Sequence, residues 1–417
     1  MAKSNQTPSS RPGDETPFVP YGRQSISDDD IAAVTSVLRG DWLTTGPAVE
    51  AFEAALCDTI GAAHSVACSS GTAALHLAML AAGIGQGDSV IVPANTFLAS
   101  ANAVRLVGAE VIFADIDPET GQMTTDHAEA ALHRAAPARL AGVLPVYFAG
   151  QCAAPLDLAA FARSHNALVI EDACHALGTL YDTDGEQHRV GACAHADMSC
   201  FSFHPVKTVT TGEGGAVTTN DPELAQRLGR FRSHGMTRDP GEVTNTVLAE
   251  GPDGSMNPWY YEMTEPGLNY RISDFQCALG TSQLSRLPAI VAHRRALAAH
   301  YREKLAPLAP MVRPLAETAG CTAAWHLQVV RIDFAAAGQS RADLMHALRE
   351  RGIGSQVHYI PVPWQPYYRD RYGETDLPGA RSYYESCLSL PLFESLTLDD
   401  VDRIVDTLAD FIIRQAV

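Results

Sequence analysis

A lysine that follows a buried strand is the residue of this sequence whose position most clearly suggests covalent chemistry. Lys207 ends the segment SFHPVK, directly after the apolar run at 198–203. A lysine withdrawn from water has a lowered pKa and becomes a nucleophile toward aldehydes. Most lysines are simply solvated at the surface, so this interpretation depends on the groups around Lys207.

A phosphate-binding turn is predicted at Ser70, Gly71 and Thr72, between a strand and a helix. Gly71 lets the backbone approach a ligand closely, and the hydroxyls of Ser70 and Thr72 add donors. The helix that follows supplies free N–H groups and the positive end of its dipole. Taken alone, the same residues are explained equally well as an ordinary helix cap.

A carboxylate and an aromatic ring are expected at the ends of two further strands. Asp172 ends the run at 167–172, and Phe97 follows the run at 89–94. Alone, Asp172 could cap a helix and Phe97 could pack in the core. Together with Lys207 and the phosphate-binding turn, however, they are the parts that pyridoxal phosphate requires. The carboxylate keeps the pyridine nitrogen protonated so that the ring accepts electrons, and the lysine forms an imine and moves protons.

An alternation of strands and helices is expected to hold these groups. Short apolar runs separated by helical segments predict a mostly parallel α/β sheet, in which ligands lie at the carboxyl ends of the strands. A second, smaller α/β unit is predicted from about residue 290, with strands at 326–333 and 355–362 around a helix at 340–351, and a final amphipathic helix at 398–417. The runs predicted as strands of the first unit are 65–68, 89–94, 110–115, 142–148, 167–172, 198–203 and 215–220.

The bulk composition excludes several classes of protein. With 417 residues, the chain is long enough for a large domain and a smaller one. The formal net charge of −18 and the absence of a Lys/Arg run argue against a nucleic-acid partner. Nine scattered cysteines without a CxxC spacing indicate reduced thiols in a cytoplasmic protein. No apolar stretch approaches the ~20 residues that span a membrane.

The chain resembles the DegT/DnrJ/EryC1/StrS family of sugar-nucleotide aminotransferases. The resemblance covers about Pro20 to the C-terminus and rests on SSGTAALHLA, PANTFLASANAV, VIEDACHALG, FSFHPVKTVTTGEGGAVTTND and GLNYRISDFQCALGTSQL. It implies the aspartate-aminotransferase fold, fold type I. The domains expected are a disordered tail at 1–17, an N-terminal segment at 18–45 that packs with the small domain, a large cofactor-binding domain at 46–288 and a small C-terminal domain at 289–417.

The resemblance also implies roles for single residues. Lys207 matches the Schiff-base lysine, and Asp172 matches the partner of the pyridinium nitrogen. His175 stands near the phenolic oxygen of the cofactor. Asn269 resembles the residue that reaches the phosphate bound in a neighbouring subunit, which implies a homodimer with composite active sites. The other cofactor-binding positions predicted are Ser70, Gly71, Thr72, Phe97 and Ser202.

A substrate is suggested by the phrases SFHPVK, WYYEMTEPGLNYRISD and VHYIPV. They resemble the branch of the family that takes an amino group from L-glutamate and aminates position 4 of a UDP-linked 4-keto-6-deoxy-N-acetyl hexose, leading toward pseudaminic acid. Arg271, His358 and Tyr359 are candidates to contact this sugar nucleotide, although a surface ion pair and strand packing explain them as well. Thr208 departs from the proline expected in that branch.

Four other functions compete with this interpretation. A dTDP- or GDP-linked keto sugar could be the acceptor of the same reaction. A dehydratase of the same fold would carry histidine in place of Lys207, and a non-catalytic pyridoxal-phosphate-binding regulatory protein would need a DNA-binding or membrane module. The histidines between 165 and 204 form neither HxH nor HExxH, so no metal site is expected.

Overall fold

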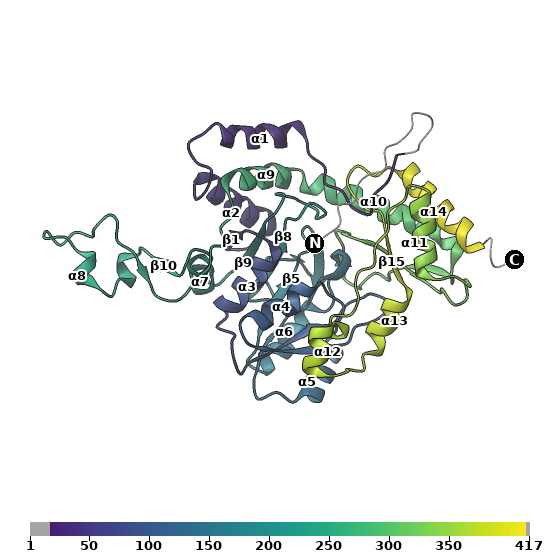
Figure 1. Cartoon of the computed structure of the whole chain (residues 1–417), viewed down its shortest axis with the longest axis horizontal. Coiled ribbons are helices and arrows are strands. Elements are labelled where there is room, and N and C mark those ends of the chain that lie inside the picture. The colour runs from purple at the N-terminus through teal and green to yellow at the C-terminus, as the bar shows by residue number, and fades with distance from the viewer. Residues whose placement is uncertain (1–16, 414–417) are drawn as a thin grey trace.

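A seven-stranded sheet forms the centre of the protein, which a computed structural model describes over residues 17–413 (Figure 1). The strand order is β1-β9-β8-β5-β4-β2-β3, and β9 is antiparallel to both of its neighbours while the other pairs are parallel. The predicted mostly parallel α/β sheet is thereby confirmed. Its strands are β1 His64–Cys68, β2 Ser89–Pro93, β3 Glu110–Ala114, β4 Leu140–Val143, β5 Leu168–Asp172, β8 Met198–Ser202 and β9 Gly215–Thr219.

Helices cover both faces of this sheet, which explains why its strands are apolar without alternation. On β2, Val90 and Val92 join the cluster packed under α3, α4 and α7, whereas Ile91 joins the cluster under α5 and α6. Towards β1 and β9, the second face is covered by α2 and α9. These helices are α2 Pro47–Ile60, α3 Gly71–Ala81, α4 Leu98–Leu106, α5 Thr125–Ala135, α6 Pro155–Ser164, α7 Pro222–Arg232 and α9 Asp274–Ser285.

The strand β4 is shorter than the predicted run at 142–148. It ends at Val143, and Pro145, which has no N–H to donate, follows within two residues. Val146 then makes a single bridge to Asp172, and the chain turns through the short helix η1 Phe148–Gly150. A small separate sheet, in the order β13-β6-β7, lies beyond β5 in the sequence. Its strands are β6 Leu180–Thr183, β7 Glu186–Arg189 and β13 Cys321–Thr322.

The C-terminal part builds a second α/β unit around a three-stranded sheet in the order β12-β14-β15. The long helix α10 and the helices α11 and α14 pack against this sheet around a separate apolar cluster. In the predicted final helix, Val401, Ile404, Leu408 and Ile412 all point into that cluster. The elements are α10 Leu287–Leu305, η3 Ala306–Leu308, β12 Val312–Pro314, β14 Gln328–Ile332, α11 Arg341–Glu350, η4 Val362–Trp364, α12 Pro366–Tyr372, α13 Pro378–Ser386, β15 Cys387–Leu390 and α14 Leu398–Ile413.

The predicted strand at 355–362 is wrong. Apart from one bridge between Gln356 and Ser389, this segment joins no ladder, and β15 takes the place beside β14. The reason lies in its hydrogen bonds, which run to the large unit. Tyr359 N donates to Asn95 Oδ1 at 3.2 Å, and the backbone N–H of Val362 donates to the carbonyl of Ala94 at 2.9 Å.

The N-terminal segment contacts both units. Val19 pairs with Ile353 of the C-terminal unit, whereas the helix α1 Asp28–Leu38 lies along α9 of the large unit. Arg286 connects the three parts, because it donates to Asp30 of α1 at 2.9 Å and to Glu394 of the C-terminal unit at 2.7 Å. The domain boundaries given above remain a prediction, and the tail predicted at 1–17 lies outside the described residues except for its last residue.

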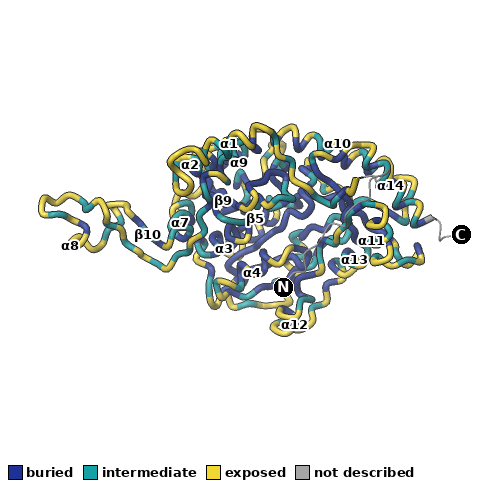
Figure 2. The backbone as a smooth tube through the Cα atoms, turned by 45° about the horizontal axis from the view of Figure 1, so that its top comes forward, coloured by how far each residue is buried: buried dark blue, intermediate teal, exposed yellow. Residues whose placement is uncertain are grey.

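An arm projects from the body beyond α7 (Figure 1). It consists of β10 Met236–Thr237, η2 Pro240–Glu242, α8 Thr246–Ala249 and β11 Glu262–Met263. Much of it is exposed (Figure 2), including apolar side chains that soluble surfaces seldom present together. Over residues 17–413, no helix is both long and apolar enough to cross a membrane.

Candidate active site

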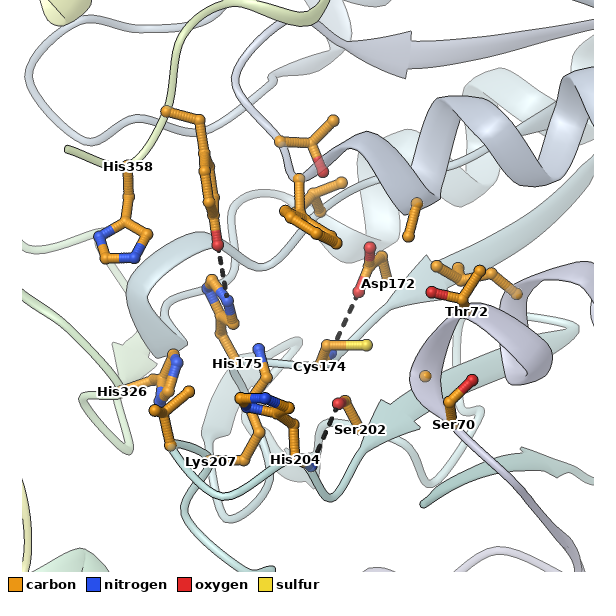
Figure 3. Close-up of a pocket in the computed structure, with 18 of the residues that line it drawn as sticks. Ser70, Thr72, Asp172, Cys174, His175, Ser202, His204, Lys207, His326 and His358 are labelled. Atoms are coloured by element: carbon orange, nitrogen blue, oxygen red, sulfur yellow. Dashed lines mark hydrogen bonds between the residues drawn. The ribbon is translucent and has the colours of Figure 1, made fainter. Parts of the chain in front are cut away.

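A cavity of about 550 Å³ opens where the carboxyl ends of β5 and β8 face the first turn of α3 (Figure 3). Loops of the C-terminal unit close its other side. The structure brings ten of the twelve predicted site residues to this cavity, from five separate stretches of chain. They are Ser70, Gly71, Thr72, Phe97, Asp172, His175, Ser202, Lys207, His358 and Tyr359.

Lys207 reaches this cavity from a tightly closed loop after β8. The backbone N–H of Phe203 donates to the carbonyl of Gly214, and that of Thr211 donates to the carbonyl of Phe203, so the loop is tied at its base. Lys207 N also donates to the carbonyl of His204 at 2.8 Å. Burial lowers the pKa of Lys207, although the nearby Asp172 favours its charged form. A larger fraction of this amine is therefore neutral and nucleophilic than in a solvated lysine.

Asp172 is held as an acceptor at the end of β5. Ser100 Oγ donates to its Oδ2 at 2.6 Å, and the backbone N–H of Cys174 approaches its Oδ1 at 3.2 Å. The carboxylate is only 6% exposed, so a cation brought into the cavity would be its natural partner. Ser100 was not among the predicted site residues. Its spacing from Thr96, one helical turn away and within 2.6 Å of it, was the available signal.

The first turn of α3 forms a cradle with Ser202. Ser70 is the N-cap of α3. Its Oγ accepts a hydrogen bond from the N–H of Ala73 at 3.1 Å, so Ser70 does cap this helix. The initial N–H groups of a helix still lack partners within the helix, and no acidic side chain opposes their positive field here. A Cβ on Gly71 would lie 2.7 Å from the Cβ of Ser202. The glycine is therefore required for this close approach.

Three buried histidines line the side of the cavity opposite α3. Burial, reinforced by the charge of Lys207, lowers the pKa of His358 to about 3 and that of His175 well below its usual value. His326 lies with its ring centroid 4.3 Å from that of His175, and burial lowers its pKa as well. All three are therefore neutral near pH 7. The Nδ1 atoms of His175 and His326 are buried and have no hydrogen-bond partner among the described residues.

His326 was not predicted as a site residue. It is the first residue of the run at 326–333, so its sequence position resembles that of an ordinary polar residue at the end of a buried strand. Arg294, itself 2% exposed, donates towards the carbonyl of His326, and the N–H of His326 donates to Ala149. These contacts come from distant parts of the chain. Further cavity residues absent from the sequence-based set include Tyr21, Cys174, His204, Glu213 and Gln356.

Two aromatic rings border the entrance. Phe97 is 56% exposed and lies 6.0 Å, centroid to centroid, from Tyr359, whose hydroxyl approaches His175 Nε2 at 3.4 Å. An exposed ring at a cavity mouth is available to stack on a flat ligand. The predicted stacking role of Phe97 remains a prediction.

Asn269 and Arg271 do not line this cavity. Asn269 is exposed and bridges Ser233 at the root of the arm. The role predicted for it concerns a second subunit and stays a prediction. Arg271 is half-buried beside it and does not contribute to the cavity of its own chain.

Comparisons with known proteins decide the family. A sequence profile described as the DegT/DnrJ/EryC1/StrS aminotransferase family matches residues 24–409. The chain belongs to this family. It is 38% identical to the spore coat polysaccharide biosynthesis protein SpsC of Bacillus subtilis over 398 residues, which cover 95% of this chain and 97% of SpsC.

Solved structures of the family match the whole fold. PseC of Helicobacter pylori, an aminotransferase involved in the biosynthesis of pseudoaminic acid, has a TM-score of 0.83 at 28% identity, covering 95% of this chain and 99% of PseC. DesV of S. venezuelae has a TM-score of 0.81 at 31% identity, covering 96% of this chain and all of DesV. This protein is therefore a sugar aminotransferase, and its family depends on pyridoxal phosphate.

The cavity fits that cofactor on its own geometry. The glycine-dependent cradle at Gly71 suits a phosphate, the buried carboxylate of Asp172 suits a protonated ring nitrogen, and the partly desolvated amine of Lys207 suits an aldehyde. These three features come from different elements and face one space (Figure 3).

We expect the Gly71→Ala substitution to weaken the binding of pyridoxal phosphate by roughly 10-fold or more, because the new methyl group must displace Ser202 and overpacking costs about 1–3 kcal/mol. Absorbance titration of the cofactor-free protein measures the change. Gly229→Ala is the matched control, since no heavy atom outside its own helix lies within 4 Å of the Cβ it would gain. Equal affinities for the two variants would show that the cradle does not hold the phosphate.

Proposed function

We propose that this protein transfers an amino group from L-glutamate to position 4 of a UDP-linked 4-keto-6-deoxy-N-acetyl hexose, in the biosynthesis of pseudaminic acid or a related sugar. The observation that carries the aminotransferase part is the convergence of Lys207 and Asp172 on one cavity that also contains a phosphate cradle. Pyridoxal phosphate, when bound, supplies a ring that accepts the electrons released at the carbon that loses or gains the proton.

The residues of the chain would divide the remaining work. The N–H groups at the start of α3, with Ser202, would hold the phosphate and fix the ring between Asp172 and the cavity mouth. Asp172, kept as an acceptor by Ser100, would hold a proton on the pyridine nitrogen. Phe97 would lie against the ring face, and His175 would face its phenolic oxygen.

Lys207 would have two tasks. Its partly desolvated amine would attach the cofactor covalently, and once a substrate amine displaced it, the same Nζ atom would carry a proton between substrate and cofactor. The lowered pKa of Lys207 supports both tasks, since each needs the neutral amine for part of the cycle. The histidines nearby are neutral, so burial and not a neighbouring positive charge lowers the pKa of this amine.

We expect borohydride to fix the cofactor on Lys207. The purified protein should be yellow, reduction should remove the visible absorbance, and peptide mass spectrometry should find the adduct on Lys207. Lys304 is the matched control, because it is a surface lysine paired with Asp402 and should remain unmodified. An adduct on any lysine other than Lys207 would overturn the assignment.

A homodimer is the second part of the proposal. The arm exposes Val247 at 87%, Leu248 at 62% and Trp259 at 71%, an apolar surface that would favour burial against another subunit. Asn269 lies at the root of this arm, where it could extend toward the cavity of the second copy. The arm therefore supports composite sites, in which Asn269 of one subunit would bind the phosphate of the cofactor held by the other subunit.

Subunit mixing tests this arrangement. Neither Lys207→Ala nor Asn269→Ala homodimers would hold an intact site, but each mixed dimer would contain one. Random exchange should therefore restore about a quarter of the wild-type activity. Mixing wild-type protein with the Lys207→Ala/Asn269→Ala double variant is the control, because its mixed dimers contain no intact site. No recovery despite demonstrated exchange would exclude the shared site.

The choice of substrate rests on the sequence phrases given above and on the likeness to PseC. His358 and Tyr359 face the cavity and would contact the sugar nucleotide, while Arg271 could do so only from a neighbouring subunit. The alternative acceptors are a GDP-linked keto sugar and a dTDP-linked keto sugar. The likeness to DesI, which was solved with its TDP-sugar product, favours the dTDP-linked one of these two.

A competition assay separates these substrates. We expect higher kcat/KM for the UDP-linked N-acetyl keto sugar than for a dTDP-linked keto sugar without the acetamido group, because a site that hydrogen-bonds this group leaves its own donors unpaired when the group is missing. The measurement is glutamate-dependent amination of both compounds in one mixture. Preference for the dTDP compound would reject the substrate and leave the aminotransferase activity unaffected.

A further inference from the structure

Two cysteines that are distant in sequence touch behind the active site. Cys152 follows η1 in the large unit, and Cys321 lies in β13, between the strands β12 and β14 of the C-terminal unit. The thiol of Cys152 donates to Cys321 Sγ across 3.6 Å, and the backbone N–H of Cys152 approaches the same sulfur at 3.3 Å. Both cysteines are free thiols in the structure.

The two sulfurs differ in their surroundings. Cys152 is 1% exposed, whereas Cys321 is half-buried and lines a separate surface cavity of about 580 Å³. The hydrogen bond from the Cys152 thiol, its backbone N–H and the charge of Arg295 lower the pKa of Cys321, while the same contact and burial raise that of Cys152. A half-buried cysteine whose pKa is lowered thus lies against a buried cysteine whose pKa is raised.

The backbone on both sides of this pair is already fixed. Thr318 N donates to Gln151 Oε1 at 2.8 Å, and His326 N donates to the carbonyl of Ala149 at 2.8 Å. The sulfurs would need to move only from 3.6 Å to the ~2.05 Å of a disulfide. Side-chain rotation provides such a movement without rearranging the two segments.

We propose that Cys152 and Cys321 form a reversible disulfide, with a hydroperoxide as the oxidant, that links the two units of the protein behind the active site. The Cys321 thiolate attacks one peroxide oxygen and the O–O bond breaks, leaving a sulfenic acid on Cys321 and releasing hydroxide, which takes up a proton to become water. Cys152 Sγ then attacks Cys321 Sγ, and the S–O bond breaks with loss of a second water. Two thiols and one hydrogen peroxide thus yield one disulfide and two waters, and a dithiol reverses the change.

The bond would restrain a particular part of the molecule. Cys321 precedes His326, which lines the active-site cavity, by five residues, and His326 leads directly into β14. A covalent link to Cys152 would hold this stretch on η1 and so limit the movement of the C-terminal unit against the large sheet. Because the bond would close a loop across 169 positions, it would also restrict the unfolded chain strongly.

The test uses the reduced, cofactor-loaded, full-length protein. It is treated with a small excess of hydrogen peroxide, the remaining thiols are blocked with N-ethylmaleimide, and peptides are mapped without reduction. We expect a cross-linked pair containing Cys152 and Cys321, lighter by two hydrogens than the separate peptides and released by dithiothreitol. The oxidised protein should also unfold at a temperature several degrees higher than the reduced protein.

Variants supply the controls. Cys152→Ser should allow peroxide to convert Cys321 to the sulfinic acid, since no thiol remains to resolve the sulfenic acid. Cys57→Ser, which removes another partly exposed cysteine, should leave the cross-link unchanged. In the wild-type protein, oxidation of Cys57 or Cys174 before any Cys152–Cys321 bond forms, or a cross-link that appears only in denaturant, would overturn the proposal. The wild-type map decides this even where a variant folds poorly.

Discussion

The parallel pairing of the central strands is the constraint on which the rest of this protein depends. Because β5 and β8 run side by side in the same direction, Asp172 and the loop that carries Lys207 emerge at one edge of the sheet. The strand β1 has the same direction, since β9 is antiparallel to both β1 and β8, so the start of α3 emerges there as well. A phosphate cradle, a carboxylate and an amine thus meet without any of them being close in sequence.

The sequence allowed this edge of the site to be predicted because each of its residues follows a strand buried on both faces. Runs such as Val90 to Val92 are apolar at every position, so the strands and their ends were visible in the sequence. Chemically distinctive residues at those ends, Asp172 and Lys207 among them, could then be assigned to one ligand. The large sheet and the cavity residues Ser70, Gly71, Thr72, Phe97, Asp172 and Lys207 follow from this reasoning, whereas the other four predicted residues of the cavity came from the family resemblance.

The opposite wall of the cavity could not be predicted in the same way. His326 owes its place to tertiary contacts that leave no periodic pattern in the sequence. The segment around His358 has the composition of a strand, but its backbone hydrogen bonds run to the loop after β2, so it stays extended without pairing in a sheet. The role predicted for Asn269 involves a second subunit and stays a prediction.

The link through Arg286 has a consequence for how the protein responds to acid. Burial raises the pKa of Asp30, but hydrogen bonds from Ser27, Ser282 and Gln283 and the charge of Arg286 outweigh this effect, so the pKa is lowered. The stability that this carboxylate contributes is complete above its ordinary pKa and is lost as the pH falls through the lowered value. Acidification would therefore weaken the contact of α1 with Arg286, the residue that also donates to Glu394 of the C-terminal unit.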